Sequence, residues 1–121
     1  MATDEVRSKR VLFLPAATAT EPPWQPRADV YRMPDGWLVK LELAGIDPGD
    51  VRVATRGDRL WVQGTRRDAR LQGCECCHRL EIEYSRFERL LELPGLSESS
   101  EVVASYRDGM LSIRIMTEGR R

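Results

Sequence analysis

One short segment of the sequence holds the residues whose types could support chemistry. Cys74, Cys76, Cys77 and the single histidine, His78, fall within positions 74–78. Thiolates and imidazole bind zinc, and thiolates are also nucleophiles and redox-active groups. If the segment is extended, Cys74, Cys76 and His78 face one side and Cys77 faces the other. The candidate chemistries are therefore metal binding, catalysis by a thiol, and thiol oxidation.

Metal binding and catalysis fit this cluster poorly. Structural zinc usually takes four ligands from two separated elements, and the sequence has no second cluster of Cys and His. Neighbouring strand residues point to opposite faces, so Cys77 and His78 cannot share the hydrogen bond that a thiol nucleophile needs. Lys9 and Lys40 are the only lysines, and no glycine-rich loop for ATP phosphates occurs. We therefore expect no enzyme activity, no metal and no cofactor.

Thiol oxidation fits the cluster better. Arg70 and Arg79 flank it, and their charge favours the thiolate. Oxidation of Cys74, Cys76 or Cys77 could cross-link two subunits or strain the segment. The alternative is that the three cysteines have no special role in a tolerant loop. An odd number of cysteines this close together is not a secreted disulfide framework, which favours a reducing compartment, the cytoplasm.

Size and charge exclude several classes of function. The chain has 121 residues, 19 basic and 19 acidic side chains, a net charge of zero and 41% hydrophobic residues. This predicts one domain with no global field that would attract nucleic acid or an anionic membrane. The longest apolar run, Val11–Leu14, is far shorter than the roughly 20 residues of a membrane span. Asp4 and Glu5 do not fit a basic signal-peptide start.

The elements that must position the cluster are predicted to be β-strands. Residues 1–26 are rich in proline and small residues, which predicts a flexible N-terminal arm. Residues 27–116 form short alternating segments separated by turns, typical of an all-β sandwich, and 117–121 form a short polar tail. About eight strands are expected, near Val30 and over Trp37–Leu43, Val51–Thr55, Arg59–Thr65, Cys76–Ile82, Phe87–Leu93, Glu101–Tyr106 and Leu111–Ile115.

The order of short motifs along the chain resembles a known family. The motifs are Trp24-x-Pro26-x-x-Asp29-x-Tyr31, Asp35-Gly36, Leu43-Ala44-Gly45-Ile46-x-x-x-Asp50-Val51, Leu60-x-Val62-x-Gly64-x-Arg66, His78-Arg79-x-Glu81, Phe87-x-Arg89, Leu93-Pro94 and Ala104-x-Tyr106-x-x-Gly109-Met110-Leu111-x-Ile113. Together they resemble the small heat-shock proteins, from about Trp24 to Ile115. The resemblance implies an immunoglobulin-like β-sandwich, the alpha-crystallin domain. It also implies an ATP-independent holdase that binds partly unfolded client proteins under stress and suppresses their aggregation.

The same resemblance implies self-association, as a homodimer or as a larger oligomer. The stretch between Gly64 and Cys77 has the length of the long loop of bacterial and plant members, which exchanges a strand between subunits. By resemblance, Arg66–Leu80 reaches the partner's first strand near Ala28–Met33. The alternative is a solvated loop. Pairing would protect an edge that is otherwise an aggregation hazard. The residues assigned to this exchange loop are Arg66, Cys76, Cys77, His78, Arg79 and Leu80.

The sequence departs from the family after its last strand. Most members carry an Ile-x-Ile or Ile-x-Val tail that docks on a neighbouring sandwich, whereas only Met116–Arg121 follow the last strand here. We expect a vacant groove between the strands at 51–55 and 101–106. Its proposed occupants are Leu12 and Leu14, which lie on one side of an extended chain. The alternative is that Val11–Leu14 contacts clients or other arms. The residues assigned to docking are Leu12, Leu14, Val51, Val53 and Val103.

A second function from another class stays open. The same sandwich occurs in co-chaperones that bind one specific folded partner and hold no clients, and fold alone does not separate the two. The closing motif and the long loop favour the holdase, whereas the missing tail motif favours the interaction module. The expected partners of a holdase are unfolded clients and a second copy of the chain, with no nucleic acid and no membrane.

Overall fold

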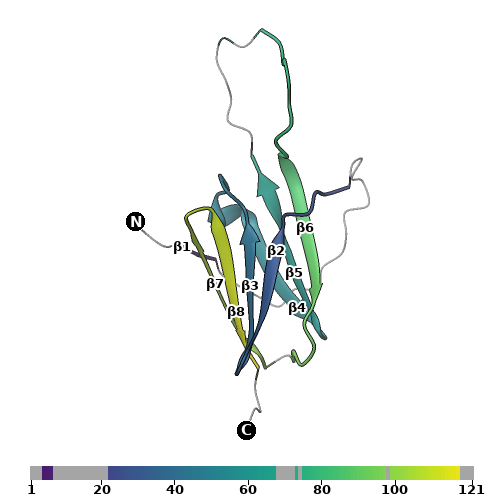
Figure 1. The fold of residues 1–121 in the computed structure, drawn as a ribbon, viewed down its shortest axis with the longest axis vertical. Coiled ribbons are helices and arrows are strands. Elements are labelled where there is room, and N and C mark those ends of the chain that lie inside the picture. Colours follow the sequence, from purple (N-terminus) through teal and green to yellow (C-terminus); the bar gives the residue numbers. More distant parts are fainter. Residues whose placement is uncertain (1–3, 7–21, 68–72, 74, 98, 118–121) are drawn as a thin grey trace.

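Strands make up almost all the regular structure of this chain. The computed structural model describes residues 4–6, 22–67, 73, 75–97 and 99–117. Within these residues it contains no α-helix and one short 3-10 helix, η1. The elements, labelled in Figure 1, are β1 (Asp4–Val6), β2 (Ala28–Met33), β3 (Gly36–Glu42), η1 (Pro48–Asp50), β4 (Val51–Arg56), β5 (Arg59–Arg66), β6 (Ser85–Glu92), β7 (Glu101–Arg107) and β8 (Met110–Met116).

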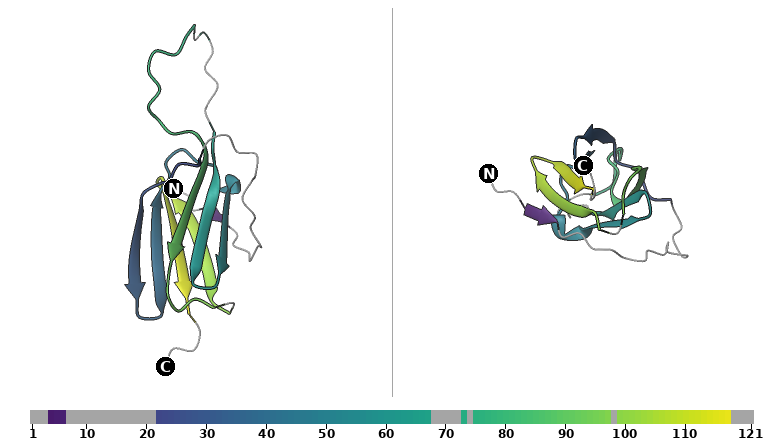
Figure 2. Two further views of the ribbon diagram at one scale, coloured as in Figure 1. Left: turned by 90° about the vertical axis from the view of Figure 1, so that its right-hand side faces the viewer. Right: turned by 90° about the horizontal axis from the view of Figure 1, so that it is seen from below.

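The strands form two antiparallel sheets. One sheet has the order β1-β7-β8-β3-β2, and the other has the order β4-β5-β6. The two sheets face each other as the layers of a sandwich (Figure 2). Tight turns connect β2 to β3, β4 to β5 and β7 to β8, and Gly109 in the last turn has a φ of 78° that favours glycine. The predicted all-β sandwich is therefore confirmed.

The hydrophobic core lies between the two sheets, and alternation along the strands supplies it. Leu111, Ile113 and Ile115 of β8 are fully buried, while the residues between them are partly exposed. Each such side chain stabilises the fold by about 1.5–3 kcal/mol. Among the described residues, no charged or polar side chain belongs to the buried set. The other buried members are Val39, Leu41, Leu43, Ile46, Val51, Val53, Ala54, Leu60, Val62, Phe87, Leu93, Leu96 and Ala104.

Gly64 allows the smaller sheet to pack closely at its centre. It lies opposite Val51 on β4 and opposite Phe87 on β6. A methyl group at this position would lie 2.7 Å from Phe87 Cζ and closer still to the carbonyl oxygen of Asp50. Only glycine leaves space for the Phe87 ring in this arrangement, which explains its place in the Leu60-x-Val62-x-Gly64-x-Arg66 motif.

Two segments differ from the predicted strands. The strand expected at Cys76–Ile82 is absent, because described residues 75–84 belong to no sheet. They form part of a loop that projects from the end of the sandwich opposite the C-terminus (Figure 1). A strand needs a neighbouring edge for its backbone hydrogen bonds, and the described part of the chain offers none at that place. Conversely, β1 lies within the expected arm, where the sequence predicted no strand.

No helix in the described ranges is long and apolar enough to cross a membrane.

Candidate functional site

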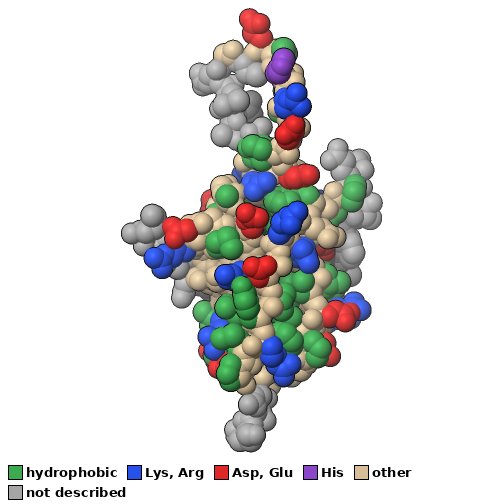
Figure 3. Space-filling model, in the orientation of Figure 1, with side chains coloured by type: hydrophobic (Ala, Val, Ile, Leu, Met, Phe, Trp, Pro, Cys, Tyr) green, Lys and Arg blue, Asp and Glu red, His purple; other side chains and the backbone are tan. Residues whose placement is uncertain are grey.

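The projecting loop between β5 and β6 carries exposed apolar side chains. Leu80, Ile82 and Tyr84 are 76%, 65% and 37% exposed. In an extended backbone, residues spaced by two point to the same face. Figure 3 shows the loop standing clear of the body of the molecule. A segment with this pattern has one apolar face. That face is exposed here and could pack against the surface of another molecule.

The cysteine cluster lies on the same loop. Cys76 and Cys77 are exposed and not joined in a disulfide, and His78 is also exposed. Arg79 donates to Glu81, with 3.2 Å between Arg79 Nη1 and Glu81 Oε2. Cys74 lies outside the described residues. Within the part of the chain that the structure describes, no three His, Cys, Asp or Glu side chains are grouped to hold a metal ion.

Arg66 anchors the returning side of the loop. Its Nε and Nη2 donate to the carbonyl oxygen of Glu83 at 2.9 and 2.6 Å, and its Nη1 donates to the carbonyl oxygen of Ala44 at 3.1 Å. The guanidinium also lies 4.4 Å from the ring centre of Trp24 and 5.7 Å from that of Tyr84. Planar guanidinium groups stack on aromatic rings while their edges donate hydrogen bonds. Arg66 therefore fixes the direction in which the loop leaves the sandwich.

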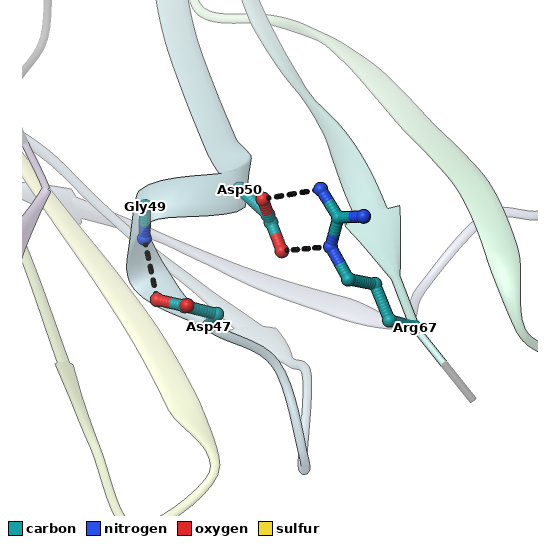
Figure 4. A network of polar contacts seen from close by, with 4 residues as sticks. All are labelled: Asp47, Gly49, Asp50 and Arg67. Atoms are coloured by element: carbon teal, nitrogen blue, oxygen red, sulfur yellow. Dashed lines mark hydrogen bonds and ion pairs between the residues drawn. The ribbon is translucent and has the colours of Figure 1, made fainter. Parts of the chain in front are cut away.

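Arg67 anchors the outgoing side of the loop. Its Nε and Nη2 donate to the two carboxylate oxygens of Asp50, at 2.8 and 3.0 Å (Figure 4). Asp50 ends η1, whose turn is capped by Asp47 accepting from the Gly49 N–H at 3.0 Å. The hydrogen bonds from Arg67 lower the pKa of Asp50, its charge lowers it further, and desolvation opposes both effects. Two-point contacts of this kind define geometry as well as charge.

Both anchors reach one connection, residues 43–50 between β3 and β4. Arg66 bonds Ala44 in this connection and Arg67 bonds Asp50. The hydroxyl group of Tyr106 donates to the Leu43 carbonyl oxygen at 2.7 Å, so the connection is also attached to β7. The base of the loop and β7 are therefore both hydrogen-bonded to this connection.

The outer edge of β2 has exposed apolar side chains that could pair with the loop's apolar face. β2 is the last strand of its sheet, and Val30 and Tyr31 are 42% and 43% exposed. Figure 3 shows hydrophobic side chains over the part of the sandwich where β2 runs in Figure 1. A sheet edge with apolar side chains is a template for another strand.

The opposite edge of this sheet is covered by β1. Asp4 pairs with Tyr106 and Val6 pairs with Ala104, so β1 extends the sheet beyond β7. β1 also lies close to η1 and β4. This is the region where the sequence predicts a vacant groove, and backbone from the expected arm occupies it. Leu12 and Leu14, the predicted occupants, lie outside the described residues.

The residues predicted to line that groove do not share a surface. Val51 and Val53 are 6% and 1% exposed and belong to the core. Val103 is 42% exposed and alternates with buried Ala104, so it points to the outer face of the sheet. The prediction placed all three along the groove, but inward and outward residues alternate along a strand.

Sequence reasoning missed three members of this site. The Asp50–Arg67 pair joins residues 17 positions apart, and Tyr106 reaches Leu43 across 63 positions. Tyr106 stands in the closing motif, so a signal for it existed. Asp50 stands in the motif that begins at Leu43, whereas Arg67 looked like an ordinary loop residue.

Comparisons with known proteins agree with this architecture. A family model described as the Hsp20/alpha crystallin family matches residues 29–121. The chain is 27% identical over 94 residues to spore protein SP21 of Stigmatella aurantiaca, covering 78% of this chain and 56% of the relative. It is 30% identical over 89 residues to a 17.8 kDa class II heat shock protein of Zea mays, covering 73% and 54%. The chain thus spans slightly more than half the length of these relatives.

A solved structure is similar over most of its length. It is a small heat-shock protein from Xylella fastidiosa, with a TM-score of 0.66 and 30% sequence identity. The superposition covers 83% of this chain and 92% of that one. The sandwich is therefore an established fold.

Proposed function

This chain belongs to the Hsp20/alpha crystallin family, and from that membership we propose that it is an ATP-independent holdase that binds partly unfolded proteins. Family membership supports a chaperone role and self-assembly, and no catalytic step is assigned to the chain. The observation that carries the proposal is apolar surface held outside the core, on the loop at Leu80 and Ile82 and on the edge of β2. A holdase needs such surface because it recognises apolar segments of unfolded proteins.

We propose that two copies dimerise by exchanging their loops. Residues 76–82 of one copy would add as a strand to the outer edge of β2 in the other, since strand addition satisfies the backbone groups of both segments. The alternate apolar residues Leu80 and Ile82 would then lie against the partner's surface around Val30. Assembly into a higher-order structure is stated for the Xylella fastidiosa protein, which supports the same tendency here.

Clients, in this proposal, bind along β7 when β1 leaves it. β1 has three residues, so few hydrogen bonds hold it. The edge of β7 that β1 covers would then accept an extended apolar segment, either from a client or from the arm at Leu12 and Leu14. Strand addition at this edge needs no specific sequence, which suits a protein with varied clients.

A light-scattering experiment tests the holdase directly. A model client is heated without nucleotide, with the protein present at subunit ratios from equal to one in ten. We expect suppression of scattering near stoichiometry, and we expect ATP to make no difference. No suppression at any ratio would contradict the holdase and favour a dedicated folded partner, which a pull-down would seek.

We further propose that the protein acts in the cytoplasm. The reducing poise there keeps exposed cysteines such as Cys76 and Cys77 as thiols. Fractionation of cells expressing the tagged chain tests this, and recovery from a secreted or oxidising compartment would contradict it.

A further inference from the structure

We propose that Cys76 and Cys77 form a two-thiol modification site that controls dimer exchange. A peroxide joins their sulfur atoms in an intrachain disulfide, and the bond prevents the loop from adding to β2 of a partner. This inference rests on the proposed exchange of loops. It gives the cysteine cluster a role in regulation of that same surface.

The two thiols meet the first requirement, which is access. Both side chains are exposed, they are not joined in a disulfide, and they lie on the loop that projects from the sandwich (Figure 1). No sheet holds the described residues 75–84, so the backbone around the thiols is not fixed by ladder hydrogen bonds. The anchors at Arg66 and Arg67 hold the base of the loop and leave this segment outside the sandwich.

The second requirement is a conflict between the disulfide and the strand. Adjacent Cα atoms are about 3.8 Å apart, shorter than the range of roughly 4.4–6.8 Å that most disulfides span. In an extended strand, neighbouring side chains also point to opposite faces, so the two sulfur atoms are held apart. A bond between Cys76 and Cys77 therefore requires the backbone to turn there. A segment that turns at 76–77 cannot present 76–82 as one extended strand.

The chemistry balances with a peroxide as the only co-reactant. A thiolate sulfur of the pair attacks one peroxide oxygen, the O–O bond breaks, and the second oxygen leaves as water after protonation. The sulfenic acid so formed is attacked by the neighbouring sulfur, the S–S bond forms, the S–O bond breaks, and a second water leaves. Two thiols lose two electrons and two protons, and one hydrogen peroxide becomes two waters.

The experiment uses the full chain carrying Cys74→Ser, so that only the proposed pair remains. After hydrogen peroxide treatment, we expect mass spectrometry to show a loss of two hydrogen masses on the peptide that contains both cysteines. We expect native mass spectrometry to show loss of the dimer, and dithiothreitol to restore both. The matched control, Cys74→Ser with Cys77→Ser, should gain oxygen at Cys76 and keep its dimer.

Several outcomes would overturn the proposal. Covalent dimers on a non-reducing gel would mean that the thiols bond between chains. Oxygen addition without an S–S bond would mean that the pair does not close. A disulfide that forms while the dimer stays unchanged would mean that the disulfide does not control dimerisation. If the reduced protein is already monomeric, the exchange proposal fails and with it the control of assembly, while the peptide mass still decides whether the disulfide forms.

Discussion

Arg66 and Arg67 are neighbours in sequence but anchor opposite sides of the projecting loop. Arg66 points to Glu83 and the Trp24 ring, and Arg67 points to Asp50. Successive side chains at the end of a strand leave on opposite faces, which lets two adjacent residues reach two different elements. The loop is therefore held in place by hydrogen bonds and ring contacts of two arginines, and not by burial of its apolar side chains.

The Asp50–Arg67 pair predicts a dependence on pH. Hydrogen bonds from Arg67 lower the pKa of Asp50. A carboxyl group whose folded-state pKa is lowered contributes stability above its unfolded value, about 3.9 for Asp, and loses it as pH falls through the folded value. The pair should therefore persist at neutral pH and be lost as pH falls below the ordinary pKa of Asp.

The variant Arg67→Gln tests this pair. We expect the pKa of Asp50, followed by NMR of its carboxyl carbon, to rise towards the ordinary value, because the main cause of the lowering is removed. Arg79→Gln is the control, since Arg79 pairs with Glu81. An unchanged pKa of Asp50 in Arg67→Gln would show that the ion pair does not exist in solution.

At the scale of elements, the loop between β5 and β6 behaves as a strand without a neighbour. Its apolar residues Leu80 and Ile82 alternate as in a strand, yet both are exposed. The β2 edge has the complementary feature, since no strand among the described residues pairs with its outer side. The loop needs a strand to pair with, and the β2 edge has backbone groups that no described strand pairs with. Each can therefore supply the partner that the other lacks when two copies of the chain meet.

Replacing both Leu80 and Ile82 with serine should separate folding from assembly. The stability of the single sandwich should change by less than about 0.5 kcal/mol, because both side chains are already exposed. Dimerisation should weaken at least about a hundredfold, because burial of each side chain contributes about 1.5–3 kcal/mol. Thermal unfolding and analytical ultracentrifugation measure the two quantities.

The control for this pair is Leu90→Ser. Leu90 is 42% exposed but lies on the outer side of β6, away from the loop. We expect its dimer to resemble that of the unmodified chain. Equal weakening by both changes would mean that the loop has no special part in assembly.

At the scale of the whole molecule, the two proposed surfaces are connected. β1 lies close to η1, and η1 belongs to the connection that Arg66 and Arg67 hold. Tyr106 joins this connection to β7, the strand that β1 covers. The loop proposed to reach a partner and the strand proposed to cover the client edge therefore both contact this connection, the loop through Ala44 and Asp50 and β1 through η1.

Proline at Glu5 and Val6 should release β1. Proline has no backbone N–H, so two adjacent prolines remove donors whichever of them faces β7. We expect faster hydrogen exchange in the peptide covering β7 and stronger protection of a heated client. The β8 peptide is the internal control, because β8 pairs with β3 and β7 and not with β1. Unchanged exchange in β7 would contradict the role given to β1.

The sequence by itself determined the sandwich. Buried Leu111, Ile113 and Ile115 alternate with partly exposed neighbours, and the turn at Gly109 needs a backbone that glycine adopts most readily. These are local properties, since period and turn chemistry are written in consecutive residues. The family membership followed from the same local motifs and is confirmed by the match over residues 29–121.

Only the tertiary structure decided which segments have neighbours. Cys76–Ile82 has the alternation of a strand but joins no sheet, whereas Asp4–Val6 has no strand signal and pairs with β7. The Asp50–Arg67 contact and the burial of Val51 and Val53 also depend on how the sheets face each other. The physical reason is that a strand is completed by hydrogen bonds to another edge, and the location of that edge is set by the fold of distant residues.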